Sequence, residues 1–330
     1  MFTGASVLVT GGTGSFGRCF IETLLAHHRP KRVVVYSRDE LKQHEFQSDL
    51  TEAQRTTVRF FIGDVRDPER LEMATRDVDH IVHAAALKQV PAAEYNPMEC
   101  IRTNVYGAEN VVRAALRNRV RKVIALSTDK AASPINLYGA SKLAADKIFV
   151  AANNLSGTIG TRFAVVRYGN VLGSRGSVVP LYRSLVAKGA KSLPITDPRM
   201  TRFWITLKQG VAFVVSSAEM MQGGEIFVPK IPSMKLVDLA RCMAPGLAHK
   251  VVGIRPGEKL HETMITEDDS RTTLELADRY IITPAFHWWT AKPYDAKSAR
   301  PVAEGFEYRS DTNPHWIDDA ALARLLEDAG

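Results

Sequence analysis

Two clusters of reactive side chains lie within sixteen residues near the middle of the chain. Ser127-Thr128-Asp129-Lys130 ends an apolar strand-like run, and Tyr138-Gly139-Ala140-Ser141-Lys142 opens a helical one. Tyr138 and Lys142 are four residues apart, so on a helix they share a face. An ammonium beside a phenol favours phenolate and is expected to lower a phenol pKa that is normally about 10. The pair is therefore predicted to be a base for an alcohol; taken alone, the spacing also suits a solvated pair on an amphipathic helix.

The N-terminus carries a glycine-rich turn that gives the Tyr138/Lys142 pair its structural context. Residues 6–10 read as a buried parallel strand, the glycine-rich turn 11–17 follows directly, and an apolar helix runs to about His28. Glycines at 11, 14 and 17 permit a tight turn, the approach of a pyrophosphate and close helix–strand packing. The helix N-terminus supplies amide donors. A dinucleotide-binding turn is thus favoured over an ordinary glycine turn, because a strand precedes it and a second strand is expected at 32–36.

The elements that must position these residues alternate along the chain. Strand-like runs cover residues 6–10, 32–36, 58–62, 80–83, 122–127 and 162–167, with helical segments between them. This alternation predicts an α/β fold with a doubly wound parallel sheet of the Rossmann type. The longest helical candidates, 97–119 and 138–155, are expected to cover the sheet or to form a dimer seam.

From about Leu172 the pattern becomes irregular and rich in Gly, Pro and Arg, which predicts a smaller C-terminal substrate-binding lobe. Residues 207–220 read as a helix, and 225–229 as a short strand that returns to the main sheet. The expected partition is 1–171 plus about 204–229 for the dinucleotide-binding domain, and about 172–203 plus 230–330 for the lobe and tail. A weak helical pattern covers 318–328.

Composition limits the classes of function. At 330 residues and 45% apolar content the chain can bury a large core. It has neither a run of ~20 apolar residues nor a signal-peptide pattern, so a cytoplasmic protein without membrane association is expected. Cys19, Cys100 and Cys242 are too far apart for a zinc motif or a disulfide framework. The net charge of +7 is spread along the chain, which favours anionic small molecules over nucleic acid.

A further candidate motif is His261-Glu262, which suggests a metal pair only superficially. A helical metal pair needs a second His four residues after the first, and Ile265 stands there. No metal site is therefore expected. His83, at the end of a strand, is expected to be a packing residue.

The motifs together resemble the extended short-chain dehydrogenase/reductase superfamily, through residues 10–17, His83-Ala84-Ala85-Ala86, Asn104 and the Tyr138/Lys142 pair. More narrowly, the chain from Met1 to about Pro284 is similar to the inverting UDP-N-acetylglucosamine 4,6-dehydratases. The matching stretches are residues 36–43, 94–100, 167–171 and 199–204, with 305–311 in the tail. In related families, retaining dehydratases generally carry Glu at the position of Lys130, and simple 4-epimerases lack the acid–base pair.

The resemblance implies a mechanism. Tyr138 takes the proton from the sugar O4 as hydride leaves C4 for the nicotinamide, Lys130 removes the C5 proton, and Asp129 protonates the departing O6 before hydride returns to C6. Reprotonation of C5 on the opposite face gives UDP-2-acetamido-2,6-dideoxy-β-L-arabino-hex-4-ulose. The implied context is an early step toward an acylamino sugar, such as pseudaminic acid, for surface glycans or flagellin glycosylation. Thr128 completes the expected catalytic set.

Physical chemistry sets a condition on that mechanism. It needs a neutral Lys130 and a protonated Asp129, whereas adjacent opposite charges in water favour the ion pair. A desolvated, substrate-filled pocket reduces the pKa difference between the two groups, because burial raises a carboxyl pKa and lowers an ammonium pKa. The two groups should then titrate as a coupled pair. The alternative for Asp129 and Lys130 is a surface salt bridge at a strand end.

NADP is the expected cofactor, because the second strand ends in Tyr36-Ser37-Arg38, where an NAD enzyme usually offers a carboxylate to the ribose. Arg38 and Lys42 would grip the 2′-phosphate, unless a displaced turn lets Asp39 supply the acid. The remaining expected cofactor-binding residues are Gly11, Thr13, Gly14, Ser15, Phe16, Gly17, Ser37, Asp64, Val65, Ala84, Ala85, Tyr138 and Lys142.

For the substrate, Arg202 and Arg255 are expected to bind the UDP diphosphate from Pro- or Gly-flanked loops, since a guanidinium fork suits phosphate oxygens. Solvated surface arginines are the alternative. Lys88, Asn170 and Glu258 complete the expected UDP-N-acetylglucosamine site. The resemblance also implies a homo-oligomer such as a hexamer. The rival functions are a retaining dehydratase or 4-epimerase on a related nucleotide sugar, and a non-catalytic NADP-sensing module of the same fold.

Overall fold

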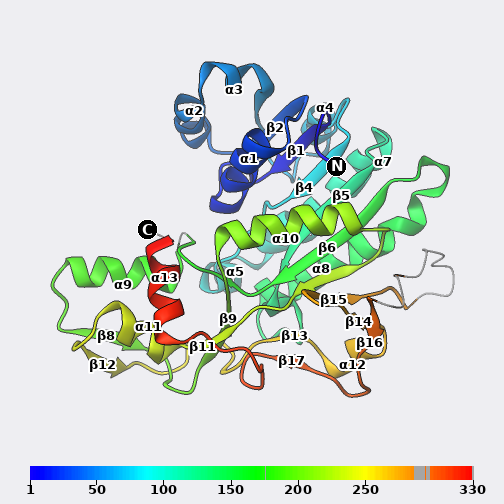
Figure 1. The fold of residues 1–330 in the computed structure, drawn as a ribbon. Helices are drawn as coiled ribbons and strands as arrows, with labels where there is room; N and C mark the ends of the chain where they lie inside the picture. Colours follow the sequence, from blue (N-terminus) through cyan, green and yellow to red (C-terminus); the bar gives the residue numbers. More distant parts are fainter. Residues whose placement is uncertain (175, 286–293, 295–297, 329–330) are drawn as a thin grey trace.

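The computed structural model describes residues 1–174, 176–285, 294 and 298–328 (Figure 1). Its centre is a ten-stranded sheet with the order β16-β14-β15-β10-β6-β5-β4-β1-β2-β3. The first strands along the chain are β1 (Ser6–Thr10), β2 (Arg32–Ser37), β3 (Val58–Ile62), β4 (His80–His83), β5 (Lys122–Thr128) and β6 (Arg162–Tyr168). They run parallel, and β10 (Ile226–Pro229) joins β6 in the same direction. The predicted doubly wound parallel sheet is confirmed.

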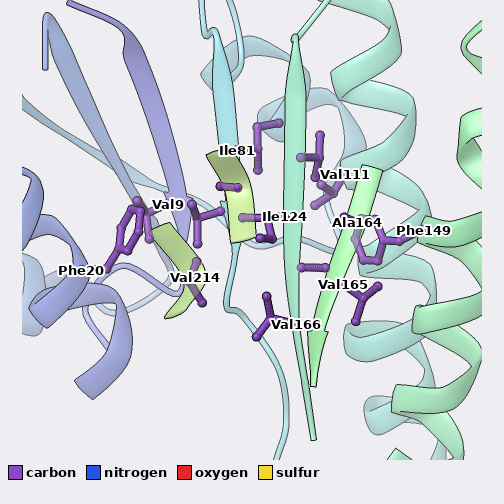
Figure 2. Close-up of a cluster of buried hydrophobic side chains, with 14 of the residues drawn as sticks. Val9, Phe20, Ile81, Val111, Ile124, Phe149, Ala164, Val165, Val166 and Val214 are labelled. Carbon is purple, nitrogen blue, oxygen red and sulfur yellow. The ribbon is translucent and has the colours of Figure 1, made fainter. Parts of the chain in front are cut away.

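Helices cover both faces of this sheet. One face carries α1 (Ser15–His27) and α10 (Leu207–Met220), and the other carries α4 (Pro68–Ala74), α7 (Gly107–Arg117) and α8 (Leu137–Ala152). Figure 2 shows Phe20 and Val214 on one side of the strands and Val111 and Phe149 on the other. Because both faces are covered, the strands read in the sequence as continuous apolar runs; all five residues of β1 are buried.

Shorter helices connect the outer strands. Between β2 and β3 lie α2 (Glu40–Asp49) and α3 (Glu52–Thr57), and after β4 comes α5 (Val90–Tyr95). The expected helix 97–119 is instead α6 (Pro97–Ile101), a π-helical turn η1 (Arg102–Tyr106) and α7. Asn104 in this turn accepts from Leu87 N at 2.8 Å and donates to Leu87 O at 3.0 Å and to Ser141 Oγ at 2.9 Å. The π turn thus joins the loop after β4 to α8, a tertiary contact that helical periodicity does not reveal.

The main sheet is wider than expected. β14 (Thr273–Glu275), β15 (Arg279–Ile282) and β16 (Arg300–Pro301) extend it antiparallel beyond β10. These residues fall in the segment 230–330 that was assigned to the lobe, so their placement differs from the expectation. Strands of two to four residues at a sheet edge leave little local pattern, and their partner strands lie far away in the sequence.

The smaller lobe is built from short sheets and helices (Figure 1). Its strands are β7 (Asn170–Val171), β8 (Ser192–Ile195), β9 (Thr201–Ile205), β11 (Ser233–Lys235), β12 (Ala248–Val251), β13 (Thr263–Ile265) and β17 (Tyr308–Arg309). Its helices are α9 (Val178–Ala187), α11 (Leu236–Met243), α12 (Glu267–Ser270) and α13 (Asp319–Asp328). Trp204, Leu239 and Leu322 share a separate apolar cluster, so the tail helix α13 packs into the lobe.

The described part of the chain contains neither a membrane-spanning helix nor a metal-binding cluster. No helix in it is long and apolar enough to cross a bilayer. Within the same residues, no group of three or more His, Cys, Asp or Glu side chains is arranged to hold a metal ion.

Candidate active site

A cavity of about 630 Å³ opens at the carboxyl ends of the parallel strands. In open α/β sheets this edge is where ligands bind. The predicted site residues that line it are Gly11, Thr13, Gly14, Ser15, Phe16, Gly17, Ser37, Arg38, Lys42, Asp64, Val65, Ala84, Ala85, Lys88, Thr128, Lys130, Tyr138, Lys142 and Asn170. The cavity therefore brings the expected cofactor-binding and catalytic segments together.

The glycine-rich turn fits a pyrophosphate. Helix α1 begins after Gly14, which provides no side-chain cap, and its first turn contains no acidic residue. The amides at this helix end are therefore available to an anion in the cavity. Gly17 permits the turn to close, because a Cβ there would lie 2.5 Å from the carbonyl oxygen of Gly11.

The end of β2 carries the groups expected to choose between NADP and NAD. The Arg38 side chain is 55% exposed, and its Nη1 lies 3.6 Å from Asp64 Oδ2. Asp39 caps α2 by accepting from Lys42 N at 3.0 Å, and its carboxylate also pairs with Lys42 Nζ. The carboxylate of Asp39 is thus engaged with the first turn of α2, although Asp39 also lines the cavity.

Asp129 lies beneath the cavity wall. β5 ends at Thr128, and the short 3₁₀ turn η2 (Asp129–Ala131) follows. Asp129 is fully buried, and its Oδ1 accepts from Thr128 Oγ1 at 2.8 Å and from Lys130 Nζ at 3.0 Å. Its Oδ2 has no partner among the described residues. Thr128 and Lys130 line the cavity, so the pair is partly desolvated and is not a surface salt bridge.

Lys130 has a second carboxylate neighbour that was not predicted. Oε1 of the buried residue Glu262 lies 3.3 Å from Lys130 Nζ. Burial alone would lower the Lys130 pKa, but the charges of Asp129 and Glu262 outweigh it and raise that pKa. The folded chain therefore favours the ionic form of the Asp129–Lys130 pair, and formation of the neutral pair is left to the substrate-filled cavity.

Tyr138 and Lys142 stand one turn apart at the start of α8. Asn136 caps this helix by accepting from Gly139 N at 2.7 Å. Gly139 allows α8 to approach η2, because a Cβ there would overlap the carbonyl oxygen of Lys130. Tyr138 is thereby brought close to Lys130.

The Tyr138 phenol pKa differs from the prediction. Burial raises this pKa to about 12, while the charge of Lys130 and a hydrogen bond with Thr128 lower it by less. Lys142 donates to Leu126 O at 2.6 Å, and burial lowers its own pKa. The prediction that Lys142 lowers the Tyr138 pKa is therefore wrong for this folded chain: desolvation dominates, and the opposing charge belongs to Lys130.

The predicted position of Arg202 is also wrong. Arg202 lies in strand β9 and is 7% exposed, not in a solvated loop. Its guanidinium donates to the carbonyl oxygens of Thr201, Lys259 and Leu260 at 2.7 to 3.1 Å. These bonds fix the segment before Glu262, and Arg202 is not among the cavity-lining residues.

Arg255 and Glu258 lie in a loop, as predicted. The Arg255 side chain is exposed, and its Nε lies 3.3 Å from Glu258 Oε1. Neither residue lines the cavity. Lys88 does line it, and burial lowers the Lys88 pKa.

Comparison with known proteins then gives the family. A model described as "Polysaccharide biosynthesis protein" matches residues 7–284. The chain belongs to this polysaccharide biosynthesis family. A relative from Campylobacter jejuni (strain 81-176), UDP-N-acetylglucosamine 4,6-dehydratase (inverting), is 55% identical over 99% of this chain and 98% of its own. The UDP-glucose 4-epimerase of Rickettsia canadensis is 41% identical over 86% of this chain and 84% of its own.

Solved structures agree with the family assignment. The X-ray structure of Pen from Bacillus thuringiensis has a TM-score of 0.90 and 35% identity, covering 99% of this chain and 98% of that one. DesIV from Streptomyces venezuelae, a dTDP-glucose 4,6-dehydratase solved with NAD bound, has a TM-score of 0.69 and 25% identity, covering 77% and 86%. The fold class and the resemblance to the inverting dehydratases are confirmed for this member of the polysaccharide biosynthesis family.

Proposed function

We propose that the protein is an inverting UDP-N-acetylglucosamine 4,6-dehydratase that forms UDP-2-acetamido-2,6-dideoxy-β-L-arabino-hex-4-ulose. The observation that carries the proposal is the meeting of Lys130 and Tyr138 on one cavity wall, at the carboxyl edge of a dinucleotide-binding sheet. The Tyr138 phenolate suits removal of a proton from an alcohol, and the Lys130 amine suits removal of a proton from carbon. The 55% identity to the Campylobacter enzyme over nearly the whole chain supports the same conclusion.

Tyr138, Lys130 and Asp129 each transfer one proton in this mechanism. A nicotinamide dinucleotide held by the glycine-rich turn would supply hydride chemistry, from the sugar C4 and back to C6. Tyr138 accepts the O4 proton, Lys130 accepts the C5 proton, and Asp129 gives its proton to O6, which leaves as water. The proton on Lys130 exchanges with solvent, and C5 receives a proton on its opposite face when C6 is reduced. Thr128 lines the cavity, and its hydroxyl donates to the buried carboxylate of Asp129, so Thr128 connects that carboxyl with the cavity wall.

The acid and the base are prepared by one internal proton transfer. Lys130 Nζ and Asp129 Oδ1 already share a 3.0 Å hydrogen bond. Moving one proton along it converts the ion pair into a neutral amine and a protonated carboxyl without exchange with solvent. The Lys130 side chain is 25% exposed, so a sugar that fills the cavity removes water from it and favours the neutral form.

NADP is the proposed cofactor. β2 ends at Ser37 with Arg38 next, and the nearby carboxylate of Asp39 is engaged with Lys42 and the N-terminus of α2. Arg38 and Lys42 would then meet a 2′-phosphate as cations at the cavity rim. NAD is the cofactor named for DesIV, which is 25% identical to this chain.

NMR of the product tests the proposal. The purified protein is incubated with UDP-N-acetylglucosamine and NADP in D₂O and sampled early, because a 4-keto sugar can epimerise at C5 after release. A 4-keto-6-deoxy product with deuterium at C5 and inverted configuration is expected. Retention at C5 from the first time point would contradict inversion. A product that keeps its C6 hydroxyl would instead favour a 4-epimerase, the activity named for the 41% identical Rickettsia relative.

A further inference from the structure

The second carboxylate beside Lys130 is almost completely enclosed. The Glu262 side chain is 2% exposed, and its Oε1 lies 3.3 Å from Lys130 Nζ and 3.7 Å from Arg202 Nε. Its Oε2 is buried with no hydrogen-bond partner among the described residues. Burial of a carboxylate costs free energy unless the charge is paired with a cation or a hydrogen-bond donor. With Asp129 included, two carboxylates lie beside Lys130 and Arg202, and Lys259 is close to the same carboxylates.

The backbone of Glu262 is held by the C-terminal tail. Ser310 N donates to Glu262 O at 2.8 Å, and Glu262 N donates to Ser310 Oγ at 2.9 Å. The same hydroxyl lies 2.7 Å from Thr201 Oγ1 on β9. A single tail residue therefore satisfies both main-chain groups of Glu262.

The tail segment is itself anchored in the core. β17 pairs antiparallel with β13, which follows Glu262 directly. The hydroxyl of Tyr308 bonds with both the nitrogen and the oxygen of Ile231, at 2.9 and 2.8 Å. The Tyr308 ring packs 4.7 Å from that of Phe203. These contacts give residues 305–311 a fixed position although they lie beyond the region that the family model matches.

We propose that Glu262 is a positioning residue for the base Lys130, and that β17 and Ser310 hold it in place, so that the C-terminal tail forms part of the dehydratase site. The inference rests on the proposed function. Two carboxylates within 3.3 Å hold the end of a flexible lysine side chain at the cavity wall.

The contacts of Lys130 direct the proton that it releases. Lys130 Nζ donates a hydrogen bond to Asp129 Oδ1 at 3.0 Å, whereas its contact with Glu262 Oε1 is an ion pair at 3.3 Å, and Arg202 Nε lies 3.7 Å from the same Glu262 oxygen. The proton that leaves Lys130 therefore follows the existing hydrogen bond to Asp129 and not the longer contact with Glu262. Asp129 is the carboxyl that must then protonate O6.

The pH dependence follows from all the charged groups around Lys130. These are Asp129 on η2, Tyr138 on α8, Arg202 on β9, and Lys259 and Glu262 before β13. The Glu262→Gln substitution removes one negative charge, which makes protonation of Asp129 harder and deprotonation of Lys130 easier. Both limbs of the pH profile of kcat should therefore move to lower pH in Glu262→Gln.

The test compares Glu262→Gln, Glu262→Asp and Ser310→Ala with wild type by NMR of dehydration. Glu262→Gln is expected to reduce kcat about 100-fold with little change in KM and to shift both limbs. Glu262→Asp keeps the charge, so its limbs should stay in place while its rate partly recovers. Ser310→Ala should lower kcat about tenfold or more. Glu307→Gln is the matched control, because Glu307 is an exposed carboxylate of the same tail segment, 3.6 Å from Arg309; its kinetics should equal those of wild type.

A wild-type rate and unshifted limbs in Glu262→Gln overturn the inference. A lower rate with unshifted limbs also overturns it, since that is the result of a purely structural role. If Glu262→Gln does not fold, the kcat values of Glu262→Asp and Ser310→Ala decide, and wild-type kinetics in both contradict the inference. A wild-type protein that does not dehydrate the substrate at all refutes the proposed function instead.

Discussion

At the scale of single residues, Lys130 is the proposed base that would distinguish elimination from simple oxidation. Without it, Tyr138 can still accept the O4 proton, but no group is positioned to take the C5 proton. We expect Lys130→Ala to lose about 10²–10⁴-fold in dehydration while C4 oxidation continues, so that reduced nicotinamide accumulates on the enzyme. Absorbance of the reduced cofactor and NMR of the sugar measure the two steps separately. Lys147→Ala, an exposed lysine of α8, is the control, and near-normal dehydration by Lys130→Ala would contradict the assigned role.

Arg38 is the residue expected to select the cofactor. Loss of one charged hydrogen bond to a 2′-phosphate costs about 1.5–3 kcal/mol, so Arg38→Ala should bind NADP roughly 10- to 100-fold more weakly. Its affinity for NAD should change little, because NAD lacks that phosphate. Calorimetry with both cofactors checks this, with the exposed Arg59 as a matched control position. Equal affinity of the wild type for the two cofactors would refute the NADP proposal.

Spacing along the sequence grouped the proposed catalytic residues, which lie close together in the chain, and missed the proposed positioning residue Glu262, which lies far from them. Asp129, Lys130 and Tyr138 fall within one strand–turn–helix segment, where spacing alone predicts a shared site. Glu262 is placed beside Lys130 by tertiary contacts, among them the pairing of β13 with β17 and the hydrogen bonds of Arg202 to residues 259 and 260, which no local pattern reveals. The Tyr138 pKa was mispredicted for a related reason, because burial depends on the whole fold.

At the scale of elements, two helix glycines should respond to alanine in opposite ways. A Cβ at Gly17 in α1 would meet the carbonyl oxygen of Gly11 at 2.5 Å, so Gly17→Ala must displace the cofactor-binding turn. Gly210 in α10 has nothing within 4 Å of the same position. Gly210→Ala should raise the free energy of unfolding by about 0.5–1 kcal/mol through helix propensity, whereas Gly17→Ala should lower it and weaken cofactor binding. Thermal unfolding of both variants decides, and equal effects would contradict the packing described.

Element prediction succeeded where the local signal was long. Apart from the edge strand β3, the strands of the parallel half are largely buried, and the predicted strand bounds match the observed ones within one residue. The antiparallel strands β14 to β16 were missed because each has few residues and owes its conformation to a distant partner. The division of the chain into 1–171 plus 204–229 and the remainder stays a prediction.

At the scale of the whole molecule, two buried histidines make stability depend on pH. Burial lowers the pKa of His80 to about 4 and that of His83 to about 3. Unfolded histidines have a pKa of about 6.5, so the unfolded chain binds more protons below that pH, and the folded state loses stability as pH falls from about 6.5 to 4. Each group contributes about 1.4 kcal/mol per pH unit in that window.

Urea unfolding between pH 7 and 5 should show this slope in the free energy of unfolding. His80→Leu should reduce the slope by about half, and His44→Gln, at an exposed histidine, should leave it unchanged. A flat profile would contradict the assignment.

The bond between the tail and Glu262 also sets an order of events during translation. The last parallel strand of the main sheet, β10, ends at Pro229, and Ser310 is synthesised 81 residues later (310 − 229). At about 5–20 residues per second, that interval lasts roughly 4–16 s. A nascent chain can therefore build its nucleotide-binding turn well before Lys130 acquires its second carboxylate. A ribosome-bound or prematurely terminated chain that lacks Ser310 is therefore expected to bind the cofactor but to eliminate water inefficiently.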